Sequence, residues 1–450
     1  MSDRTEGETE ASVEVAVEAR AVADLSPAER RGFFERSAGV DAVREDVVPI
    51  VSRVRAEGDA ALREFAEEFD DVTVGNLDVT DEAERAVEAV DDETLAAIRE
   101  AVSNVREFHE RQAPTDWRET VDGRELGRRF RPLDRVGVYV PGGAAAYPSS
   151  AIMGVVPATV AGVEHVAVAT PPGDPVPPAT LAAAHEAGAD RVYRVGGAQA
   201  VAALAYGTET VHAVRKVVGP GNAYVTAAKA EVRGDVDIDF LAGPSEVLVV
   251  CDDSADPDLV AADLVAQAEH DPNAAVTAVT DDETTARAVA AAVTEQVPDR
   301  ARAETCAAAL DNDASGVLYA RSRAEAALFA EEYAAEHLSI QARDDEALAE
   351  RITNAGSLFL GPYTPVAAGD YASGTNHVLP TGGGARVYGG LSVDTFVRSS
   401  TVQRLDRAAL ADLAPTVTRL AETEGLEAHA ESVRRRVEGA SRNGDGDAEE

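Results

Sequence analysis

The sequence has few lysines, cysteines and aromatic residues, and it has a large excess of acidic side chains. Lys216 and Lys229 are the only lysines, so the other 39 of the 41 basic residues (41 − 2) are arginine. Against them stand 81 acidic residues, which leave a formal net charge of −40. Nucleic acids and anionic membranes attract clustered basic side chains, so this charge argues against both as partners. Cys251 and Cys306 are too few for a disulfide scaffold.

Long apolar runs and a signal peptide are also missing. No run reaches the ~18 apolar residues that a membrane span needs. The first residues, MSDRTEGETE, lack the basic start and apolar stretch of a signal peptide. We therefore expect a soluble, cytoplasmic protein. An acidic, lysine-poor surface fits a protein that stays soluble in concentrated salt, where counter-ions screen repulsion between like charges. We hypothesise a halophilic protein from a salt-accumulating cytoplasm.

Two blocks of the chain alternate short β-branched runs with alanine-rich helical runs. In the first block the predicted strands are Val136–Val140, His165–Thr170 and Arg191–Val195. In the second block they are Glu246–Cys251, Ala275–Thr280, Gly316–Ala320 and Ser357–Leu360. The spacing is that of βαβ units, which favour parallel strands. We predict an α/β fold with two Rossmann-like open-sheet domains and helical N- and C-terminal extensions, with ligands beyond the carboxyl ends of the strands.

Two pairs of residues near predicted helix ends carry metal-ligand or acid–base atoms. Gln267 and His270 lie about one helical turn apart, so they share a face and could ligate a divalent metal. A histidine at a helix end is more often a partner of the helix dipole, and spacing favours that interpretation. Glu336 and His337 could supply two bases, but on spacing alone a capping glutamate and a surface histidine are favoured.

The loop at 369–377 is more informative. Its glycines permit sharp turns, while Asp370 and His377 offer a carboxylate and an imidazole, so binding is favoured over mere connection. Glu424 and His429 lie in a C-terminal helical region, where a solvated helix face is the simpler explanation. We assign structural roles to the other histidines, which are His109, His165, His185 and His212.

Three glycine-rich turns are candidates for ligand contacts, and two of them bear on phosphate binding. Pro141-Gly142-Gly143 and Gly196-Gly197 follow predicted strands, but neither matches the GxGxxG fingerprint of dinucleotide-binding turns. A third turn, Gly219-Pro220-Gly221-Asn222, ends in an asparagine that could reach a ligand. Spacing alone therefore leaves nucleotide binding open.

Whole segments of the chain match a known family. They are Arg-Val-Gly-Val-Tyr-Val-Pro-Gly-Gly at 135–143, Gly-Gly-Ala-Gln-Ala at 196–200, Gly-Pro-Gly-Asn-Ala-Tyr-Val at 219–225, Ala-Gly-Pro-Ser-Glu at 242–246, Gln-Ala-Glu-His at 267–270 and Glu-His-Leu at 336–338. The longest and most specific is Ala-Gly-Asp-Tyr-Ala-Ser-Gly-Thr-Asn-His-Val-Leu-Pro-Thr at 368–381. In these motifs, and over residues 35–436, the chain resembles the histidinol dehydrogenase family.

The resemblance implies NAD-dependent oxidation of L-histidinol through L-histidinaldehyde to L-histidine, the final steps of histidine biosynthesis. It also implies two NAD molecules used in sequence, one zinc ion per subunit and a homodimer with a shared active site. By resemblance, the zinc ligands are Gln267, His270, Asp370 and the partner subunit's His429. The water-activating acid and the general base are Glu336 and His337. The NAD contacts are Tyr139, Gln199 and Asn222, and the substrate contacts are Ser245, Gln267, His270, His337, Asp370, His377, Glu424 and His429.

With this resemblance we predict a division of the chain into domains. Residues 1–34 are an N-terminal tail and helical extension. Residues 35–138 with 245–391 form the metal- and substrate-binding domain, and residues 139–244 form the NAD-binding domain. Residues 392–440 are a C-terminal helical dimerisation extension, and 441–450 are a disordered tail. One departure from the family pattern is Ala335, where proline is common. It changes no chemical group, so we expect little effect on activity.

Other functions compete with this interpretation. A zinc- and NAD-dependent dehydrogenase of another small polyol, such as a sulfonated diol, is disfavoured because Glu424 would repel a sulfonate. A zinc hydrolase that binds no dinucleotide is disfavoured by the two-block α/β pattern, and a non-catalytic nucleotide-binding protein by the many acid–base groups. We reject aldehyde oxidation through a cysteine, because neither cysteine lies in a matched site segment and the route needs an exposed, activated thiolate.

Overall fold

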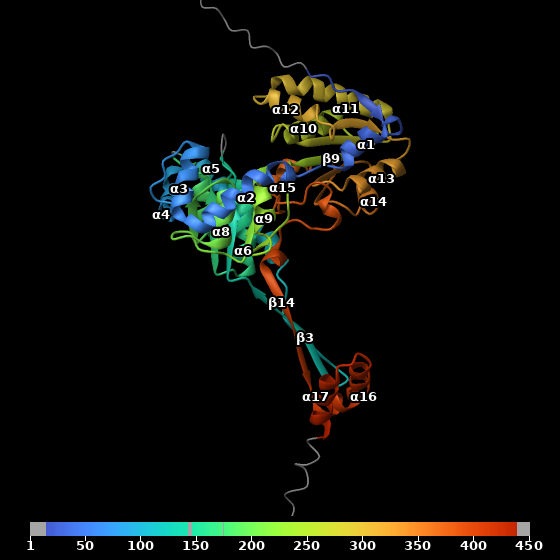
Figure 1. Ribbon diagram of the computed structural model, residues 1–450. Helices are drawn as coiled ribbons and strands as arrows, with labels where there is room; N and C mark the ends of the chain where they lie inside the picture. The colour runs from blue at the N-terminus through green and yellow to red at the C-terminus, as the bar shows by residue number, and fades with distance from the viewer. Residues whose placement is uncertain (1–14, 143–145, 174, 439–450) are drawn as a thin grey trace, which may run out of the picture. The chain divides into compact units, whose positions relative to one another are not determined.

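The computed structural model describes residues 15–142, 146–173 and 175–438 (Figure 1). Residues 1–14, Gly143 and the predicted tail at 441–450 lie outside these residues. The chain divides into two compact units. The larger unit comprises residues 1–112 and 133–396, and the smaller unit comprises residues 113–132 and 397–450. Within the described ranges, no helix combines the length and the apolar character needed to cross a membrane.

Among its described residues, the larger unit holds two parallel sheets. The five-stranded sheet has the order β6-β5-β4-β7-β8. Its strands are β4 (Arg135–Tyr139), β5 (His165–Thr170), β6 (Arg191–Arg194), β7 (Lys216–Val218) and β8 (Asp237–Ile238). The chain adds β5 and β6 on one side of β4 and then crosses to β7 on the other side. The order therefore reverses between β4 and β7, which is the switch point where open sheets bind ligands.

Helices cover both faces of the five-stranded sheet. One face packs against α4 (Thr80–Ala89), α5 (Asp92–Glu110), α6 (Pro148–Ala161) and α7 (Pro178–Ala187). The other face packs against α2 (Val40–Glu57), α3 (Asp59–Asp70), α8 (Gly197–Tyr206) and α9 (Ala223–Val232). Side chains of β4 and β5 enter these two layers alternately, which is why both strands are apolar at nearly every position.

The six-stranded sheet has the order β1-β11-β10-β9-β12-β13. Its strands are β1 (Ala19–Ala21), β9 (Glu246–Cys251), β10 (Ala275–Thr280), β11 (Gly316–Tyr319), β12 (His337–Gln341) and β13 (Ser357–Leu360). One face packs against α10 (Pro257–Ala268), α11 (Glu283–Gln296) and α12 (Ala303–Leu310). The other packs against α1 (Pro27–Phe34), α13 (Arg323–Tyr333) and α14 (Asp345–Ala349). The predicted α/β fold with two Rossmann-like sheets is confirmed.

The helices before the five-stranded sheet pack differently from the predicted division. That division grouped residues 35–138 with residues 245–391, whereas helices α2 to α5 share their buried side chains with the five-stranded sheet. The N-terminal extension also contributes β1, the edge strand that pairs with β11. The physical reason is that hydrophobic periodicity shows which face of a helix is buried but not which sheet covers it. The domain boundaries themselves stay a prediction.

The smaller unit combines an antiparallel sheet with helices. The sheet has the order β14-β3-β2, and the elements are β2 (Trp117–Val121), β3 (Arg124–Pro132), β14 (Val397–Leu405), α16 (Arg407–Thr423) and α17 (Glu427–Glu438). The predicted helical extension at 392–440 thus includes a long strand, because β14 pairs with a partner far away in the sequence that no local pattern indicates. In the described part of α16 and α17, the buried residues are Ala409, Ala421 and Ala430. This unit therefore buries little apolar surface by itself.

Candidate active site

Glu336 and His337 lie at the amino end of β12, and both side chains are buried. Their exposed fractions are 6% and 3%. Ala334, in the left-handed conformation with φ of 53°, turns the chain out of α13 just before them. The interpretation favoured by spacing alone, a capping glutamate and a surface histidine, is wrong. β12 is an interior strand, paired with β9 on one side and β13 on the other, and the His337 ring packs against the ring of Phe359.

The main chain of Glu246, the first residue of β9, holds both side chains. Its N–H donates to Glu336 Oε2 at 2.7 Å, and its carbonyl oxygen lies 2.9 Å from His337 Nδ1. A carbonyl only accepts, so Nδ1 carries the proton in this contact and Nε2 is the free ring nitrogen. Nε2 lies 3.3 Å from Asp370 Oδ1 but has no hydrogen bond to any described residue.

Opposing effects set the protonation of this pair. Burial alone would lower the pKa of His337, but the carboxylates of Glu336 and Asp370 outweigh burial and raise that pKa well above its usual value. Burial raises the pKa of Glu336, and the proximity of His337 opposes this rise. The two residues therefore form one coupled acid–base group, in which the proton of one depends on the charge of the other.

Asp370 and His377 join the same cluster from α15 (Val366–Tyr371) and the loop after it. Burial raises the pKa of Asp370, but the proximity of His337, whose Nε2 lies 3.3 Å from Oδ1, outweighs burial and lowers the pKa overall. His377 Nδ1 donates to the carbonyl oxygen of Asp370 at 2.8 Å, and its Nε2 lies 3.5 Å from Ser150 Oγ on α6. Burial lowers the pKa of His377. This segment thus presents a carboxylate and an imidazole to the cluster, and its binding role stays a prediction.

Gln267 and His270 lie at the C-terminal end of α10 and in the turn after it. Gln267 is buried, and its amide nitrogen has no partner among the described residues. Because the amide can flip, this position can also present an oxygen. The His270 side chain is exposed, yet surrounding protein atoms desolvate the ring and lower its pKa, while the charge of Asp370 opposes this effect. His270 therefore lies within electrostatic reach of Asp370.

The donor atoms of this cluster fit a zinc ion. Imidazole nitrogens and carboxylate oxygens are ordinary zinc ligands, and two buried nitrogens, His337 Nε2 and Gln267 Nε2, lack partners in the described part of the chain. The described residues contain no group of three or more His, Cys, Asp and Glu side chains that could hold a metal. Within one chain, the predicted zinc ligands are Gln267, His270 and Asp370. Only His270 and Asp370 belong to the residue types of that search, so a group of three is not expected from one chain.

The cluster lies at the amino ends of the strands in the six-stranded sheet, which corrects the predicted carboxyl-end location for this sheet. Glu246 and His337 each open their strands, and the two strands run side by side. Gln267 reaches the same edge because α10 runs back from the carboxyl end of β9. The reactive groups therefore come from strand beginnings and helix ends.

The predicted NAD contacts lie at the carboxyl edge of the five-stranded sheet. Tyr139 ends β4, is buried, and accepts a hydrogen bond from the Gly197 N–H at 3.1 Å. Gln199, also buried, lies in the first turn of the helix that Gly197 begins. Gly219 follows β7 and approaches so closely that an added Cβ would lie 2.1 Å from the Tyr139 carbonyl oxygen. Asn222 caps α9 and is exposed. These residues surround the switch point of the sheet.

A buried ion pair fixes the turn that carries Asn222. Lys229 Nζ lies 2.6 Å from Asp239 Oδ1 and donates to the Gly219 carbonyl oxygen at 2.5 Å. Asp239 Oδ2 in turn accepts from the Gly219 N–H at 2.8 Å. One lysine and one aspartate therefore hold both main-chain polar groups of Gly219 at the start of the turn.

The other predicted substrate contacts are more dispersed. Ser245 directly precedes Glu246 and is partly buried, so it lies at the edge of the cluster. Glu424 is the C-cap residue that directly follows α16, and His429 lies on α17. Both are exposed residues of the smaller unit. Their roles stay predictions.

Both cysteines are buried. Cys251 lies at the carboxyl end of β9, and burial raises its pKa to about 12. Burial also raises the pKa of Cys306. Neither thiol is poised to ionise at neutral pH, which supports the rejection of a cysteine-based aldehyde oxidation.

Three polar residues around the cluster carry no prediction from the sequence. Glu246 forms a buried ion pair with Arg36. Asp263 on α10 accepts hydrogen bonds from Gln341 Nε2 at 2.9 Å and from the Val366 N–H. The signal for Glu246 was its place in the matched segment at 242–246. Arg36 and Asp263 had no signal, because an isolated charged residue ordinarily indicates a solvated surface position.

Comparisons with known proteins agree on one family. A family model described as histidinol dehydrogenase matches residues 35–437. The histidinol dehydrogenase of Haloarcula marismortui is 72% identical and aligns over 93% of this chain and 99% of its own length. That of Halobacterium salinarum is 70% identical, over 94% of this chain and 100% of its own length. A crystal structure of histidinol dehydrogenase from Elizabethkingia anophelis matches with a TM-score of 0.89 at 35% identity, covering 95% of this chain and 99% of that chain.

Proposed function

The chain belongs to the histidinol dehydrogenase family, and we propose that it catalyses the NAD-dependent four-electron oxidation of L-histidinol through L-histidinaldehyde to L-histidine, the final steps of histidine biosynthesis. The observation that carries this proposal is the buried Glu336–His337 pair, whose free nitrogen faces Asp370. Two successive oxidations with a hydration between them need two groups that accept protons in one enclosed site.

His337 is the general base. Glu246 holds its Nδ1 proton, so Nε2 is the atom that accepts the hydroxyl proton of histidinol once a cation offsets the charge of Asp370, which otherwise favours the protonated ring. After that proton has left to solvent and the aldehyde has been hydrated, Nε2 accepts a proton of the hydrate. Glu336 activates the water for hydration by accepting its proton at the carboxylate. The burial of both side chains excludes bulk water, which protects a reactive aldehyde from side reactions.

Gln267, His270 and Asp370, with His429 of the partner subunit, would hold one zinc ion. When bound, zinc would offset the charge of Asp370 and orient the imidazole and amine nitrogens of the substrate. The unpartnered Gln267 amide and the buried Asp370 support this assignment. We also assign substrate contacts to Ser245, His377 and Glu424, together with the zinc ligands and His337. The Glu424 carboxylate suits this role because it can accept hydrogen bonds from the N–H groups of histidinol.

NAD, when bound, would supply the hydride acceptor. We assign its contacts to Tyr139, Gln199 and Asn222, which lie around the switch point between β4 and β7. The close approach of Gly219 to Tyr139 leaves room only for backbone there, as in turns that bind phosphate.

We propose a homodimer with shared active sites. The smaller unit carries Glu424 and His429 at exposed positions and buries little apolar surface by itself. Packing against a second copy would give it the core that it lacks. We further propose a halophilic protein of the cytoplasm. The net charge of −40 and the similarity to proteins of Haloarcula marismortui and Halobacterium salinarum support a salt-rich interior.

NADH production per histidinol consumed tests the function. The purified protein is assayed in molar salt, with and without a chelator, and NADH is followed by absorbance. We expect a ratio near two and loss of activity on chelation, restored by zinc. A ratio near one would indicate a simple alcohol dehydrogenase. Turnover of a sulfonated diol in preference to histidinol would replace the proposed substrate.

A further inference from the structure

Glu246 occupies an unusual position, because its main chain contacts both catalytic side chains. Its N–H fixes the Glu336 carboxylate, and its carbonyl fixes the Nδ1 proton of His337. Any movement of the first residue of β9 therefore shifts the acid and the base together. What holds Glu246 in place accordingly controls the geometry of the pair.

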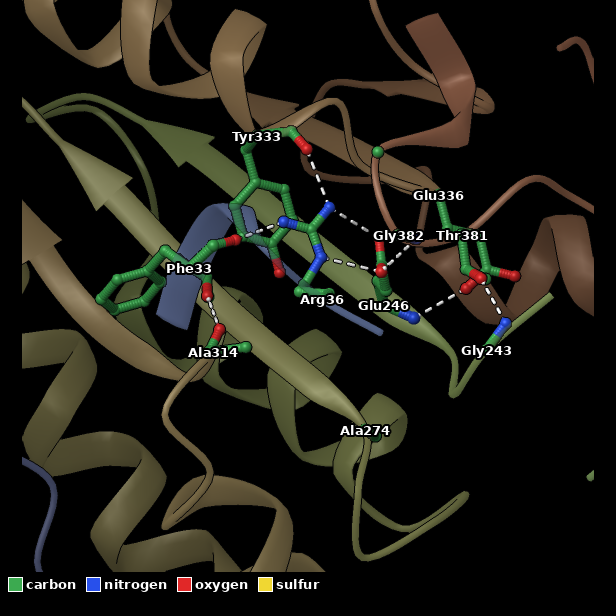
Figure 2. A network of polar contacts seen from close by, with 12 residues as sticks. Phe33, Arg36, Gly243, Glu246, Ala274, Ala314, Tyr333, Glu336, Thr381 and Gly382 are labelled. Carbon is green, nitrogen blue, oxygen red and sulfur yellow. Dashed lines mark hydrogen bonds and ion pairs between the residues drawn. The ribbon is translucent and has the colours of Figure 1, made fainter. Parts of the chain in front are cut away.

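The Glu246 side chain is held from two directions, as Figure 2 shows. Arg36 donates from Nε to Oε1 at 2.8 Å and from Nη2 to Oε2 at 3.0 Å, which is a bidentate pair. The Gly382 N–H donates to Oε1 at 2.7 Å. The carboxylate thereby links β9 to the segment after α1 and to the loop that follows His377.

Arg36 is itself fixed on every side. Its side chain is 6% exposed, and its guanidinium carbon lies 3.7 Å from the centre of the Tyr333 ring. Nη2 also donates to the Tyr333 carbonyl oxygen at 2.8 Å, and Nη1 donates to the carbonyl oxygen of Phe33. Tyr333 ends α13, three residues before Glu336, so the same guanidinium also anchors the chain that leads into the catalytic pair.

The Arg36–Glu246 ion pair also has an electrostatic role. Glu246 and Glu336 are both buried carboxylates in direct contact through the Glu246 main chain. A buried carboxylate without a cation is costly, and Arg36 is the cation paired with Glu246. Without Arg36, the free charge of Glu246 would repel Glu336 and favour a shift of the strand end.

We propose that Arg36 and Glu246 are positioning residues for catalysis, with Arg36 holding the Glu246 carboxylate so that the Glu246 main chain aligns Glu336 and His337. This inference rests on the proposed function, because it assigns a task in the same reaction. Neither residue is among the proposed substrate contacts. Their effect is on the rate of the chemical steps rather than on substrate affinity.

The test measures kcat, KM and thermal stability for Arg36→Gln, Arg36→Lys, Glu246→Gln and the Arg36→Gln/Glu246→Gln double variant. We expect Arg36→Gln to lower kcat by about 10- to 100-fold, since small misplacement of catalytic groups has effects of that size. KM for histidinol and for NAD should change less than about threefold. Arg36→Lys, which keeps the charge but loses the bidentate fork, should retain more kcat than Arg36→Gln. The double variant should be no slower than the slower single variant, because both act through one contact.

Arg323→Gln is the matched control. Arg323 pairs at 2.8 Å with Asp252, a buried carboxylate just beyond the opposite end of β9. Its loss disturbs the same strand without touching the catalytic pair. We expect lower stability and an unchanged kcat.

The outcomes separate the inference from the proposed function. If the unaltered protein makes no NADH from histidinol, the function itself fails. If it does, and folded Arg36→Gln keeps kcat within about twofold, the positioning role is refuted. An equal loss of kcat in Arg323→Gln, or a loss confined to KM, also refutes it. Should Arg36→Gln not fold, the double variant, which leaves no unpaired buried charge but lacks the bidentate contact, decides by the same twofold criterion.

Discussion

Replacing Asp263 by asparagine should stabilise the protein at neutral pH. Asp263 is 7% exposed, and its carboxylate receives hydrogen bonds from Gln341 Nε2 and from the Val366 N–H. Among the described residues, no basic side chain offsets its charge, so burial dominates and raises its pKa from 3.8 to about 6. Asparagine keeps one oxygen, which can accept from the Val366 N–H. The side-chain amide of Gln341 can flip, so that its Oε1, which has no partner among the described residues, accepts from the new amide group.

The size of the effect follows from linkage. A carboxyl group whose pKa is higher in the folded state favours folding fully below pH 3.8, and this contribution disappears as the pH rises through about 6. At pH 8 the ionised Asp263 therefore costs about 3 kcal/mol relative to low pH, and at pH 5.5 about 2 kcal/mol. Asparagine does not titrate. The free energy of unfolding of the variant should therefore exceed that of the unaltered protein by up to these amounts, with the larger difference at pH 8.

Urea denaturation at fixed molar salt measures the free energy of unfolding of both proteins at the two pH values. Asp258→Asn, an exposed position on the same helix, is the control and should change stability by less than about 0.5 kcal/mol. Equal or lower stability of Asp263→Asn at pH 8 would refute the reasoning. So would a gain that does not shrink at pH 5.5.

Four further results are expected. His337→Asn should lower kcat by roughly 10²- to 10⁴-fold with zinc content unchanged by metal analysis, and full turnover would remove His337 as the base. Mixing His429→Ala with His337→Ala chains should restore some activity, whereas verified heterodimers without activity would contradict a shared site. Lys229→Met should raise KM for NAD roughly tenfold, which corresponds to about 1.4 kcal/mol of binding free energy, because the turn at Gly219 loses its hydrogen bond from Lys229. KM for histidinol should not change. A Cys251→Ala, Cys306→Ala double variant should keep its activity, and inactivity of the folded variant would reopen a thiol mechanism.

The elements of the larger unit were largely predictable because their signals are local. The strands at 165–170, 246–251 and 275–280 have the predicted bounds, since each is a short apolar run between turn residues. The assignment of helices to sheets was not predictable. Helices α4 and α5 have a clear apolar face, but that face fits the five-stranded or the six-stranded sheet equally well until both sheets are in place.

The residues of the candidate site were likewise only partly predictable from local patterns. Asp370 and His377 were identified from a glycine-rich loop, and the structure connects them by a hydrogen bond. Spacing alone favoured ordinary roles for Glu336 and His337, because a two-residue pattern carries no information about burial. The resemblance to a family, rather than their spacing, singled them out.

The sequence by itself determined the α/β class, the parallel strands and the residue types available for acid–base and metal chemistry, because these depend on local periodicity and on which side chains the chain carries. Only the tertiary structure decided that the reactive groups meet at the amino edge of the six-stranded sheet, with a glutamate main chain fixing the proton on His337. It also decided that Arg36 lies against Glu246, 210 residues away in the chain. Contacts of that range depend on how sheets and helices pack together, and no local pattern encodes them.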